Sequence, residues 1–249
     1  MALYKIDNVK KLSNLLSGHK YICFLDFEGT QFSHEMIAYG AVLASLKKDG
    51  TIKNHKEPIK VYVKAKNKVG KFVEQLTGIT DYTLQHSGVS FLEAMKQLKK
   101  YCGLHFSKCL FVTFGNHDLK ILNQSIAYSL DAPKDITTYI HKGFFDYQAF
   151  ISNYCRDEAN NPYSLENYLN VYNVKFEGTA HDPRYDALNL MYLYDAFLKN
   201  KEITVSEYLK VLAKTNHIPA PIKKVVEKLS RGENITSEEY IQFVKDDIQ

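Results

Sequence analysis

The first third of the chain consists of short apolar runs separated by polar turn residues, a pattern typical of β-strands. The runs YICFL (21–25), EMIAYGAVLASL (35–46) and IKVYVKAK (59–66) predict three strands. An Asp-Gly pair at 49–50 predicts a turn between the second and third strands. A later run, CLFVTF (109–114), predicts a further buried strand. We therefore expect a sheet built mainly from the beginning of the chain.

Apolar residues in the rest of the chain recur at helical spacing. One helix is expected over 91–102, where Ser90 and Glu93 form a capping-box pattern at the start. Other helices are predicted at 116–130, near 146–155, at 164–170 and at 183–199. Strands followed by helices interleaved with further strands predict an α/β fold, with a mixed sheet covered by helices on both faces.

After residue 200 the pattern changes to short amphipathic helices separated by proline and glycine. Three such helices are predicted, at about 204–214, 219–229 and 236–246. We therefore divide the chain into a main domain, 1–199, and a small C-terminal helical extension, 200–249.

The composition is that of a globular protein, since 45% of the 249 residues are hydrophobic and 24% are charged. No segment approaches the ~20 uninterrupted apolar residues that a membrane span needs. The first residues also lack the apolar stretch of a signal peptide. We therefore expect a cytoplasmic protein with no membrane partner. The four cysteines follow no CxxC spacing, so neither a structural zinc site nor a disulfide framework is expected.

The net charge is only +4, but the lysines are unevenly distributed. Between Lys47 and Glu74 there are nine lysines and three acidic residues. This local excess would allow the segment to follow a phosphate backbone. Lysines at the edge of a sheet also discourage pairing with another strand, which explains the pattern equally well.

Two carboxylates directly follow the apolar run at 21–25. Asp26 and Glu28 are two residues apart, so in an extended chain they lie on the same face. Carboxylate oxygens are the ligands that Mg²⁺ and Mn²⁺ prefer, and a cation would relieve the repulsion between the two acids. Acids at an exposed strand end are the alternative interpretation. Phe27, between the acids, could stack on a nucleic-acid base.

A second candidate region is the sequence HDPRYD (181–186). Asp182 is a good N-cap and Pro183 suits the first helical position, so a helix is expected to start here. His181 and Asp186 then occupy the two positions, N′ and N4, that come into contact across the first turn. Asp186 shares a helical stripe with apolar residues and is expected to point toward the core. The alternative is an acid that only interacts with the helix dipole.

Asp118 follows the predicted strand at 109–114, in the first turn of the next helix. It lies on the same helical stripe as Leu122 and Ile126, so it is expected to face the sheet near the strand ends. Asn116 is the leading candidate for the N-cap of this helix, although Asp118 could take that role.

In this order, Asp-x-Glu, Asp and His-x4-Asp resemble the three motifs of the DEDDh branch of the DnaQ-like exonucleases. The motifs here are YICFLDFEGT, FVTFGNHDLK and HDPRYDALN, and the resemblance spans about residues 20–199. The stretches FVEQLTGIT, SLENYLNVYNVKFEGTAHD and FFDYQAF look most like a subgroup that includes Eri-type RNA exonucleases, the 3′ histone-mRNA exonuclease and bacterial KapD-type proteins. Tyr185 departs from the pattern, since many members carry an acid there. The C-terminal extension has no counterpart in the minimal domain.

The resemblance implies an RNase H-like fold and a metal-dependent 3′→5′ exonuclease. Asp26, Glu28 and Asp186 would hold one of two divalent cations, Mg²⁺ or Mn²⁺. Asp26 would bridge to the second cation, and Asp118 would assist through water. His181 would be the general base, while the two cations stabilise the attacking and leaving oxygens of an in-line displacement.

The implied partner is nucleic acid with a free 3′ end, from which nucleoside 5′-monophosphates would be released. RNA is favoured by the subgroup, and single-stranded DNA is the other candidate substrate. By resemblance, Leu76 and Thr77 would contact the terminal nucleotide. The alternative is a catalytically silent nucleic-acid-binding or scaffold protein with the same fold, but all four acids and the histidine are present.

Residues 115–118 read GNHD, which also resembles an element of two-metal phosphoesterases in which Asn and His bind metal ions. Those enzymes also need an upstream D-x-H and a late GH-x-H. Glu28 stands where the first of these would have His, and no GH-x-H occurs. We therefore interpret His117 as a residue at the start of a helix.

Overall fold

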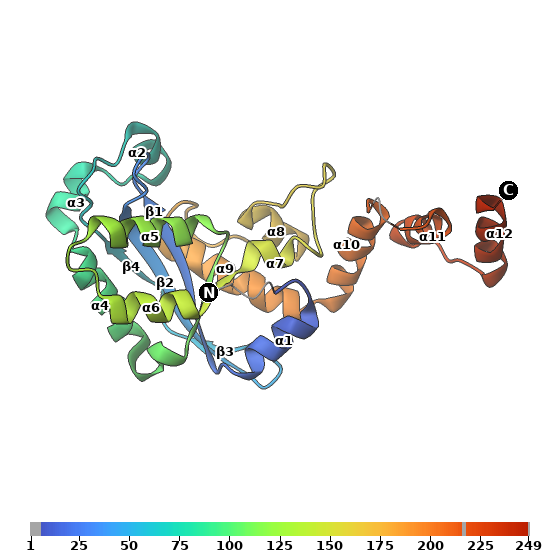
Figure 1. The fold of residues 1–249 in the computed structure, drawn as a ribbon, viewed down its shortest axis with the longest axis horizontal. Coiled ribbons are helices and arrows are strands. Elements are labelled where there is room, and N and C mark those ends of the chain that lie inside the picture. Colours follow the sequence, from blue (N-terminus) through green and yellow to red (C-terminus); the bar gives the residue numbers. More distant parts are fainter. Residues whose placement is uncertain (1–5, 216–217, 249) are drawn as a thin grey trace.

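The structure, a computed structural model, describes residues 6–215 and 218–248. A six-stranded sheet lies at the centre of the main domain, with helices on both faces (Figure 1). Parallel and antiparallel strand pairs both occur in this sheet. The structure thereby confirms the expected α/β class, a mixed sheet flanked by helices.

The strands are β1 (Tyr21–Gly29), β2 (Met36–Leu46), β3 (Ile52–His55), β4 (Ile59–Tyr62), β5 (Leu110–Thr113) and β6 (Phe144–Asp146). Their order in the sheet is β3-β2-β1-β5-β6, and β4 also pairs with β2. β1 is antiparallel to β2 and parallel to β5, and β5 is parallel to β6. β1 is therefore an interior strand, hydrogen-bonded on both sides.

Two groups of helices cover the two faces of the sheet. One face packs against α1 (Val9–Ser17), α7 (Tyr147–Ile151), α8 (Leu165–Val171) and α9 (Pro183–Lys199). The other face packs against α4 (Phe91–Cys102), α5 (His117–Tyr128) and α6 (Lys134–Lys142). The remaining helices of the main domain are α2 (Lys71–Thr77), α3 (Asp81–Ser87) and the 3₁₀-helix η1 (Gly103–Lys108).

The side chains of β1 alternate between the two faces, and this alternation places its acids. Ile22 and Phe24 belong to the core that includes α9, whereas Leu25 belongs to the core that includes α4 and α5. Asp26 and Glu28 follow Ile22 and Phe24 at the same two-residue spacing and point to the same face. Both acids therefore face the side of the sheet on which α9 lies.

The edge of the sheet differs from the sequence prediction. The turn at 49–50 leads into an additional strand, β3, and only then does the chain return as β4. β3 has the sequence IKNH, so no apolar alternation marks it. The strand predicted at 59–66 pairs regularly only to Tyr62, after which Val63 makes an isolated bridge to Val89. β6 precedes α7 where a helix is predicted from about residue 146.

Four predicted helices are confirmed as α4, α5, α8 and α9, and their caps differ in part. Ser90 accepts a hydrogen bond from the Glu93 N–H, but the Glu93 carboxylate pairs with Gln97 instead of completing a capping box. Asn116 stands at the N-cap position of α5, as predicted, but its side chain makes no capping hydrogen bond. The helices α1, α2, α3 and α6 were not predicted from the sequence.

The C-terminal extension forms α10 (Lys201–Ala213), α11 (Ala220–Ser230) and α12 (Ser237–Asp247). α10 contacts the main domain through Tyr208, whose ring centroid lies 5.1 Å from that of Tyr154, and through Thr204, whose hydroxyl lies 3.0 Å from Tyr172 Oη. α11 and α12, which we call the arm, extend beyond the main domain (Figure 1). None of the described helices has the length and apolar character of a membrane span. The domain boundary at residue 199 stays a prediction.

Candidate active site

β1 carries Asp26 and Glu28 near its end, inside the strand rather than after it. Pairing with β2 continues past both acids, with Asp26 opposite Gly40. The register of this pairing shifts between Glu28 and Gly29, at the end of the strand. Both acids are half-buried and share one face of the strand, as their spacing predicts.

Gly40 allows the start of α9 to approach the sheet beside Asp26. A Cβ atom at Gly40 would lie 1.8 Å from the carbonyl oxygen of Pro183 and 2.4 Å from the backbone nitrogen of Arg184. Such distances are far shorter than any van der Waals contact, so only glycine allows this backbone approach. The first turn of α9 therefore packs directly against Gly40, the residue of β2 that pairs with Asp26.

The turn before α9 sets the position of His181. Its φ is +63°, in the left-handed region that residues other than glycine rarely adopt. Asp182 then caps the helix as predicted, with Oδ1 accepting from the Arg184 N–H at 3.1 Å, and Pro183 takes the first helical position. The backbone N–H of His181 interacts with the carboxylate of Asp186 across this turn and opposes the rise of its pKa. The cap thus joins the imidazole and the carboxylate in one local unit.

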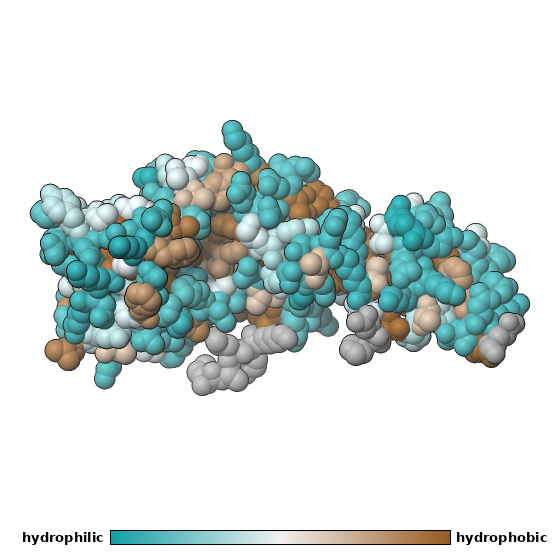
Figure 2. Space-filling model, turned by 90° about the horizontal axis from the view of Figure 1, so that it is seen from above, coloured by the Kyte–Doolittle hydropathy of each residue, from teal (hydrophilic) through white to brown (hydrophobic). Residues whose placement is uncertain are grey.

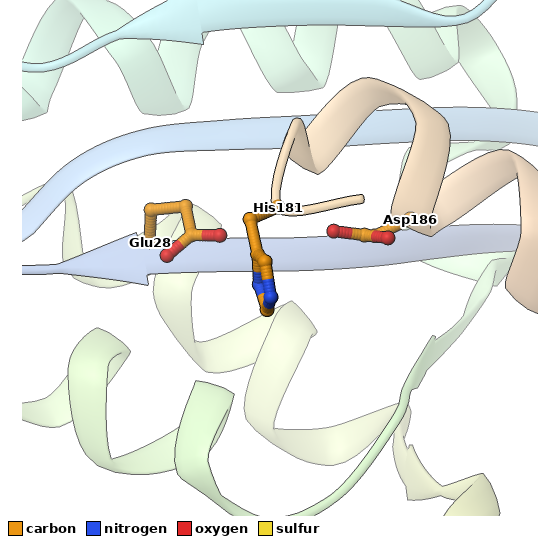
Figure 3. A group of neighbouring side chains, drawn as sticks. All are labelled: Glu28, His181 and Asp186. Atoms are coloured by element: carbon orange, nitrogen blue, oxygen red, sulfur yellow. The ribbon is translucent and has the colours of Figure 1, made fainter. Parts of the chain in front are cut away.

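The side chains of Glu28, His181 and Asp186 meet at the face of the sheet (Figure 3). One ligand atom from each, two carboxylate oxygens and an imidazole nitrogen, all lie within 4.8 Å of one another. In Figure 3 the imidazole lies between Glu28 on β1 and Asp186 at the start of α9. Within residues 6–215 and 218–248, this is the one group of three or more His, Cys, Asp or Glu side chains with such geometry.

Asp118 reaches β1 from α5. β5 ends at Thr113, and beyond that point Asp118 Oδ1 accepts the Phe27 N–H at 2.7 Å. Asp118 is buried against the sheet, as its helical stripe predicts. The side chain of Phe27 is only 5% exposed and belongs to the core that includes α4 and α5. The prediction that this ring could stack on a base is therefore wrong, and Phe27 instead contributes its backbone N–H.

Burial and mutual repulsion raise the pKa values of the acids. Burial, followed by the charges of Asp186 and Asp118, raises the pKa of Glu28 to about 8, and the positive charge of Lys60 opposes this rise. Burial is also the main cause that raises the pKa of Asp118 and that of Asp186 to about 7. The pKa of Asp26 is raised by burial and then by the neighbouring acids. The cluster is thus short of positive charge.

A divalent cation fits this donor set. Carboxylate oxygens are the ligands of Mg²⁺ and Mn²⁺, and nearby positive charge lowers the pKa of an acid. The raised pKa values show that the acids lack such compensation within the protein itself. The residues that would hold the metal are Asp26, Glu28, Asp118 and Asp186.

The phosphoesterase interpretation of residues 115–118 finds no support. His117 is the first residue of α5, as predicted, and its exposed ring meets that of His34 edge to face at 5.2 Å between centroids. Among the described residues, His117 is not part of the group that could hold a metal ion.

Leu76 and Thr77, the residues expected to contact the terminal nucleotide, lie at the end of α2. Leu76 is 42% exposed and is available for contact with a ligand. The Thr77 hydroxyl donates to the Val73 carbonyl and accepts from the Ile79 N–H, so it stabilises the end of the helix. Nucleotide contact stays a prediction for both residues.

Two residues that shape the site were not singled out from the sequence. Gly40 admits α9, and a glycine inside an apolar strand is a signal of close backbone approach that could have identified it. Lys60 Nζ lies 3.2 Å from Asp182 Oδ2, but nothing in the sequence separates Lys60 from its neighbouring lysines.

Solved structures share this fold. A 3′-exonuclease described with 3′-end-specific recognition of the histone mRNA stem-loop aligns with a TM-score of 0.60 at 21% identity, over 77% of this chain and 69% of that chain. The nuclease domain of 3′hExo, a DEDDh family member bound to rAMP, aligns with a TM-score of 0.51 at 21% identity, over 74% and 94%. E. coli exonuclease I in complex with a dA16 oligonucleotide aligns with a TM-score of 0.54 at 14% identity, over 84% and 46%. A search of curated proteins gave no match.

A family model described as exonuclease (RNase_T) matches residues 23–194. This span is more than half of the chain, and it contains the two acids of β1, Asp118 and the turn from His181 to Asp186. The order of these residues and the fold agree with the DEDDh pattern that the sequence indicates. The chain therefore belongs to the exonuclease family.

Proposed function

We propose that this protein is a metal-dependent 3′→5′ exonuclease that removes nucleoside 5′-monophosphates from a free 3′ end. The observation that carries the proposal is the convergence of Glu28, His181 and Asp186 within 4.8 Å. Asp26 lies in the same strand row as Glu28, and Asp118 is hydrogen-bonded to the residue between them. Acids and an imidazole gathered in this way suit hydrolysis of a phosphodiester.

The acids are proposed to hold two divalent cations, Mg²⁺ or Mn²⁺. Asp26, Glu28 and Asp186 would hold one cation, and Asp26 would also help to hold the second, with Asp118 assisting through water. When bound, the cations supply positive charge that stabilises the attacking and leaving oxygens of an in-line displacement. The half-buried position of the acids reduces competition from bulk water for the same charge.

His181 is proposed to accept the proton of the attacking water. Its side chain is exposed, so both solvent and a bound phosphodiester can reach it, and it borders Glu28 and Asp186. General-base catalysis of this kind typically contributes about 10²- to 10⁴-fold. The left-handed turn that positions the imidazole is therefore part of the proposed mechanism.

RNA is the proposed substrate, with single-stranded DNA as the second candidate. Two of the similar structures concern a histone mRNA stem-loop and rAMP, whereas the structure of E. coli exonuclease I contains dA16. Their identities to this chain are 14% to 21%, so they support the choice of polymer only as an analogy. Leu76 and Thr77 are proposed to contact the terminal nucleotide, and we propose a cytoplasmic location.

The test is a degradation assay with 5′-labelled RNA and DNA oligomers, each single- and double-stranded, in Mg²⁺ or Mn²⁺. We expect stepwise shortening from the 3′ end, release of nucleoside 5′-monophosphates, faster loss of RNA and no reaction with EDTA. His181→Ala is expected to slow the reaction by about 10²- to 10⁴-fold. Internal cleavage or shortening from the 5′ end would contradict the proposed direction, and full activity of His181→Ala would remove its proposed role.

A further inference from the structure

Lys60 lies in one row of the sheet with Asp26. Gly40 of β2 pairs with Asp26 of β1 on one side and with Lys60 of β4 on the other. Directly opposed residues of neighbouring strands point to the same face, so Lys60 and Asp26 flank the glycine on which α9 begins. Because Pro183 occupies the space above Gly40, the first turn of the helix is seated between the lysine and the acid.

Lys60 forms a partly buried ion pair with the residue that caps α9. Its Nζ lies 3.2 Å from Asp182 Oδ2, and the two side chains are 16% and 21% exposed. The other oxygen of Asp182 accepts the Arg184 N–H. The carboxylate of Asp182 therefore holds the helix start with one oxygen and β4 with the other.

The other cation near Asp182 is less well placed. The Arg184 Nη2 lies 3.8 Å from Asp182 Oδ2, and the arginine side chain is 40% exposed. Its guanidinium lies over the ring of Tyr185, 4.4 Å from the centroid. Lys60 is thus the closer and more buried partner, and a less exposed pair is less screened by solvent.

His181 directly precedes Asp182 in the chain. Its left-handed backbone conformation, with a φ of +63°, costs free energy and persists only when the surroundings impose it. Its backbone N–H interacts with the carboxylate of Asp186 and opposes the rise of that pKa. The restraint that the contacts define is the position of Asp182, which the helix cap and Lys60 set together.

We propose that Lys60 is a positioning residue that holds the turn at Asp182, so that the imidazole of His181 faces Glu28 and Asp186. Lys60 acts through Asp182 rather than by touching the reacting phosphodiester. The inference rests on the proposed function for its effect on catalysis, but the position of the imidazole can be measured without any reaction. A displacement of about 1 Å of a catalytic group can cost up to about 10²-fold in rate.

The kinetic test compares Lys60→Met, Lys60→Arg and Asp182→Asn with the wild type. Asparagine is also a good N-cap, so Asp182→Asn removes the ion pair while keeping the helix start. We expect Lys60→Met and Asp182→Asn to lower kcat by about 10- to 100-fold with KM changed less than about twofold. Lys60→Arg should recover most of the rate, and the double variant should be no slower than either single variant.

Lys199→Met is the matched control, because Lys199 also pairs with an aspartate, Asp195, but at the far end of the same helix. It should keep the wild-type kcat and KM. A higher KM at constant kcat in Lys60→Met would identify Lys60 as a phosphate contact and overturn the proposal. A loss of kcat in Lys199→Met equal to that in Lys60→Met would overturn it as well.

The direct readout is the ring resonance of His181 in metal-free protein labelled with ¹³C-histidine, assigned by its loss in His181→Asn. We expect this resonance to move in Lys60→Met and Asp182→Asn and to stay in place in Lys199→Met. An unmoved resonance in Lys60→Met would overturn the proposal. If the wild type has no nuclease activity, the proposed function fails, but the resonance still decides whether Lys60 positions the imidazole.

Discussion

The main domain and the arm both contain amphipathic helices, but only the main domain covers their apolar faces. In α9, ten of 17 residues are buried, and Leu193 and Phe197 belong to the same core as strand β1. In α11 and α12 the one buried residue is Pro221. Leu229 and Ile241 are 37% and 52% exposed, and Figure 2 shows brown residues scattered over the otherwise mostly teal surface of the arm.

The difference in packing explains why the candidate site lies in the main domain and not in the arm. A catalytic group must be held to within a fraction of an ångström, which needs an element fixed by hydrogen bonds and a packed core. β1 is paired on both sides, while α5 and α9 pack on its opposite faces. The arm has helices of 11 residues that depend on little tertiary packing, and helices of that length are marginal in isolation.

The largest expected effect separates the acids of the site from those of the arm. Asp26→Asn should lower the exonuclease rate by roughly 10³-fold, because it removes a proposed bridging ligand worth several kcal/mol of charge stabilisation. Asp247→Asn, at the end of α12, should leave the rate unchanged. Single-turnover degradation of a 5′-labelled RNA oligomer measures both, and wild-type activity in Asp26→Asn would refute the proposed metal site.

The second prediction compares two leucines. Leu193→Ala opens a cavity in the core and should lower the free energy of unfolding by about 2–5 kcal/mol. Leu229→Ala in the arm should cost less than about 1 kcal/mol, because that side chain already contacts water. Urea denaturation followed by circular dichroism measures both values. Equal losses would show that the arm has a core of its own.

Two glycines give a third comparison. Gly40→Ala places a Cβ against the Pro183 carbonyl, so α9 must move, and we expect about 1–3 kcal/mol of destabilisation together with a lower exonuclease rate. Gly232→Ala meets no atom within 4 Å, but the φ of +76° should cost about 1 kcal/mol without a change in rate. Thermal unfolding and exonuclease assays on each purified variant measure the destabilisation and the change in rate. An active Gly40→Ala would mean that the start of α9 can shift without harm.

The fourth prediction concerns pH and metal ions. The pKa of Glu28 rises from 4.5 to about 8 on folding, so the folded protein binds this proton more tightly than the unfolded chain. The resulting stabilisation is fully present below pH 4.5 and is lost as the pH rises through about 8. The thermal midpoint of the metal-free protein should therefore decrease as the pH is raised from 5 to 8.5. Mn²⁺ should raise this midpoint more at pH 8 than at pH 6.

Glu28→Gln is the control for this titration. It should flatten the dependence of the thermal midpoint on pH in part, because the amide does not ionise while Asp26, Asp118 and Asp186 still do. The same flattening is not expected for Glu238→Gln in the arm. A wild-type midpoint that rises steadily across the interval would contradict the raised pKa values.

The smallest effect is expected from removal of the arm. A chain that ends at Thr215 keeps α10 and its contacts with the main domain. Its thermal midpoint should change by less than about 2 °C, because α11 and α12 bury only Pro221. The exonuclease rate on a short RNA should stay within about twofold of that of the full chain. A large loss of rate would place the arm in the path of the substrate.

The sequence predicted most of the elements that carry the site, because their signals are local. Asp182 and Pro183 marked the start of α9, and the predicted bounds of this helix are those of the structure. The two-residue spacing of Asp26 and Glu28 required a shared face in any strand. β3 and β6 were missed, because a polar or three-residue strand is defined by its hydrogen-bonded neighbours and not by its own pattern.

The sequence alone singled out the residues that we propose to carry the chemistry and indicated on which face of its own element each acid lies. Only the tertiary structure decided that Phe27 turns its ring into the core, that Gly40 admits a helix, and that Lys60 pairs with Asp182. The physical reason is that side-chain periodicity is a property of one segment, whereas close approach and ion pairing depend on distances between segments remote in the chain.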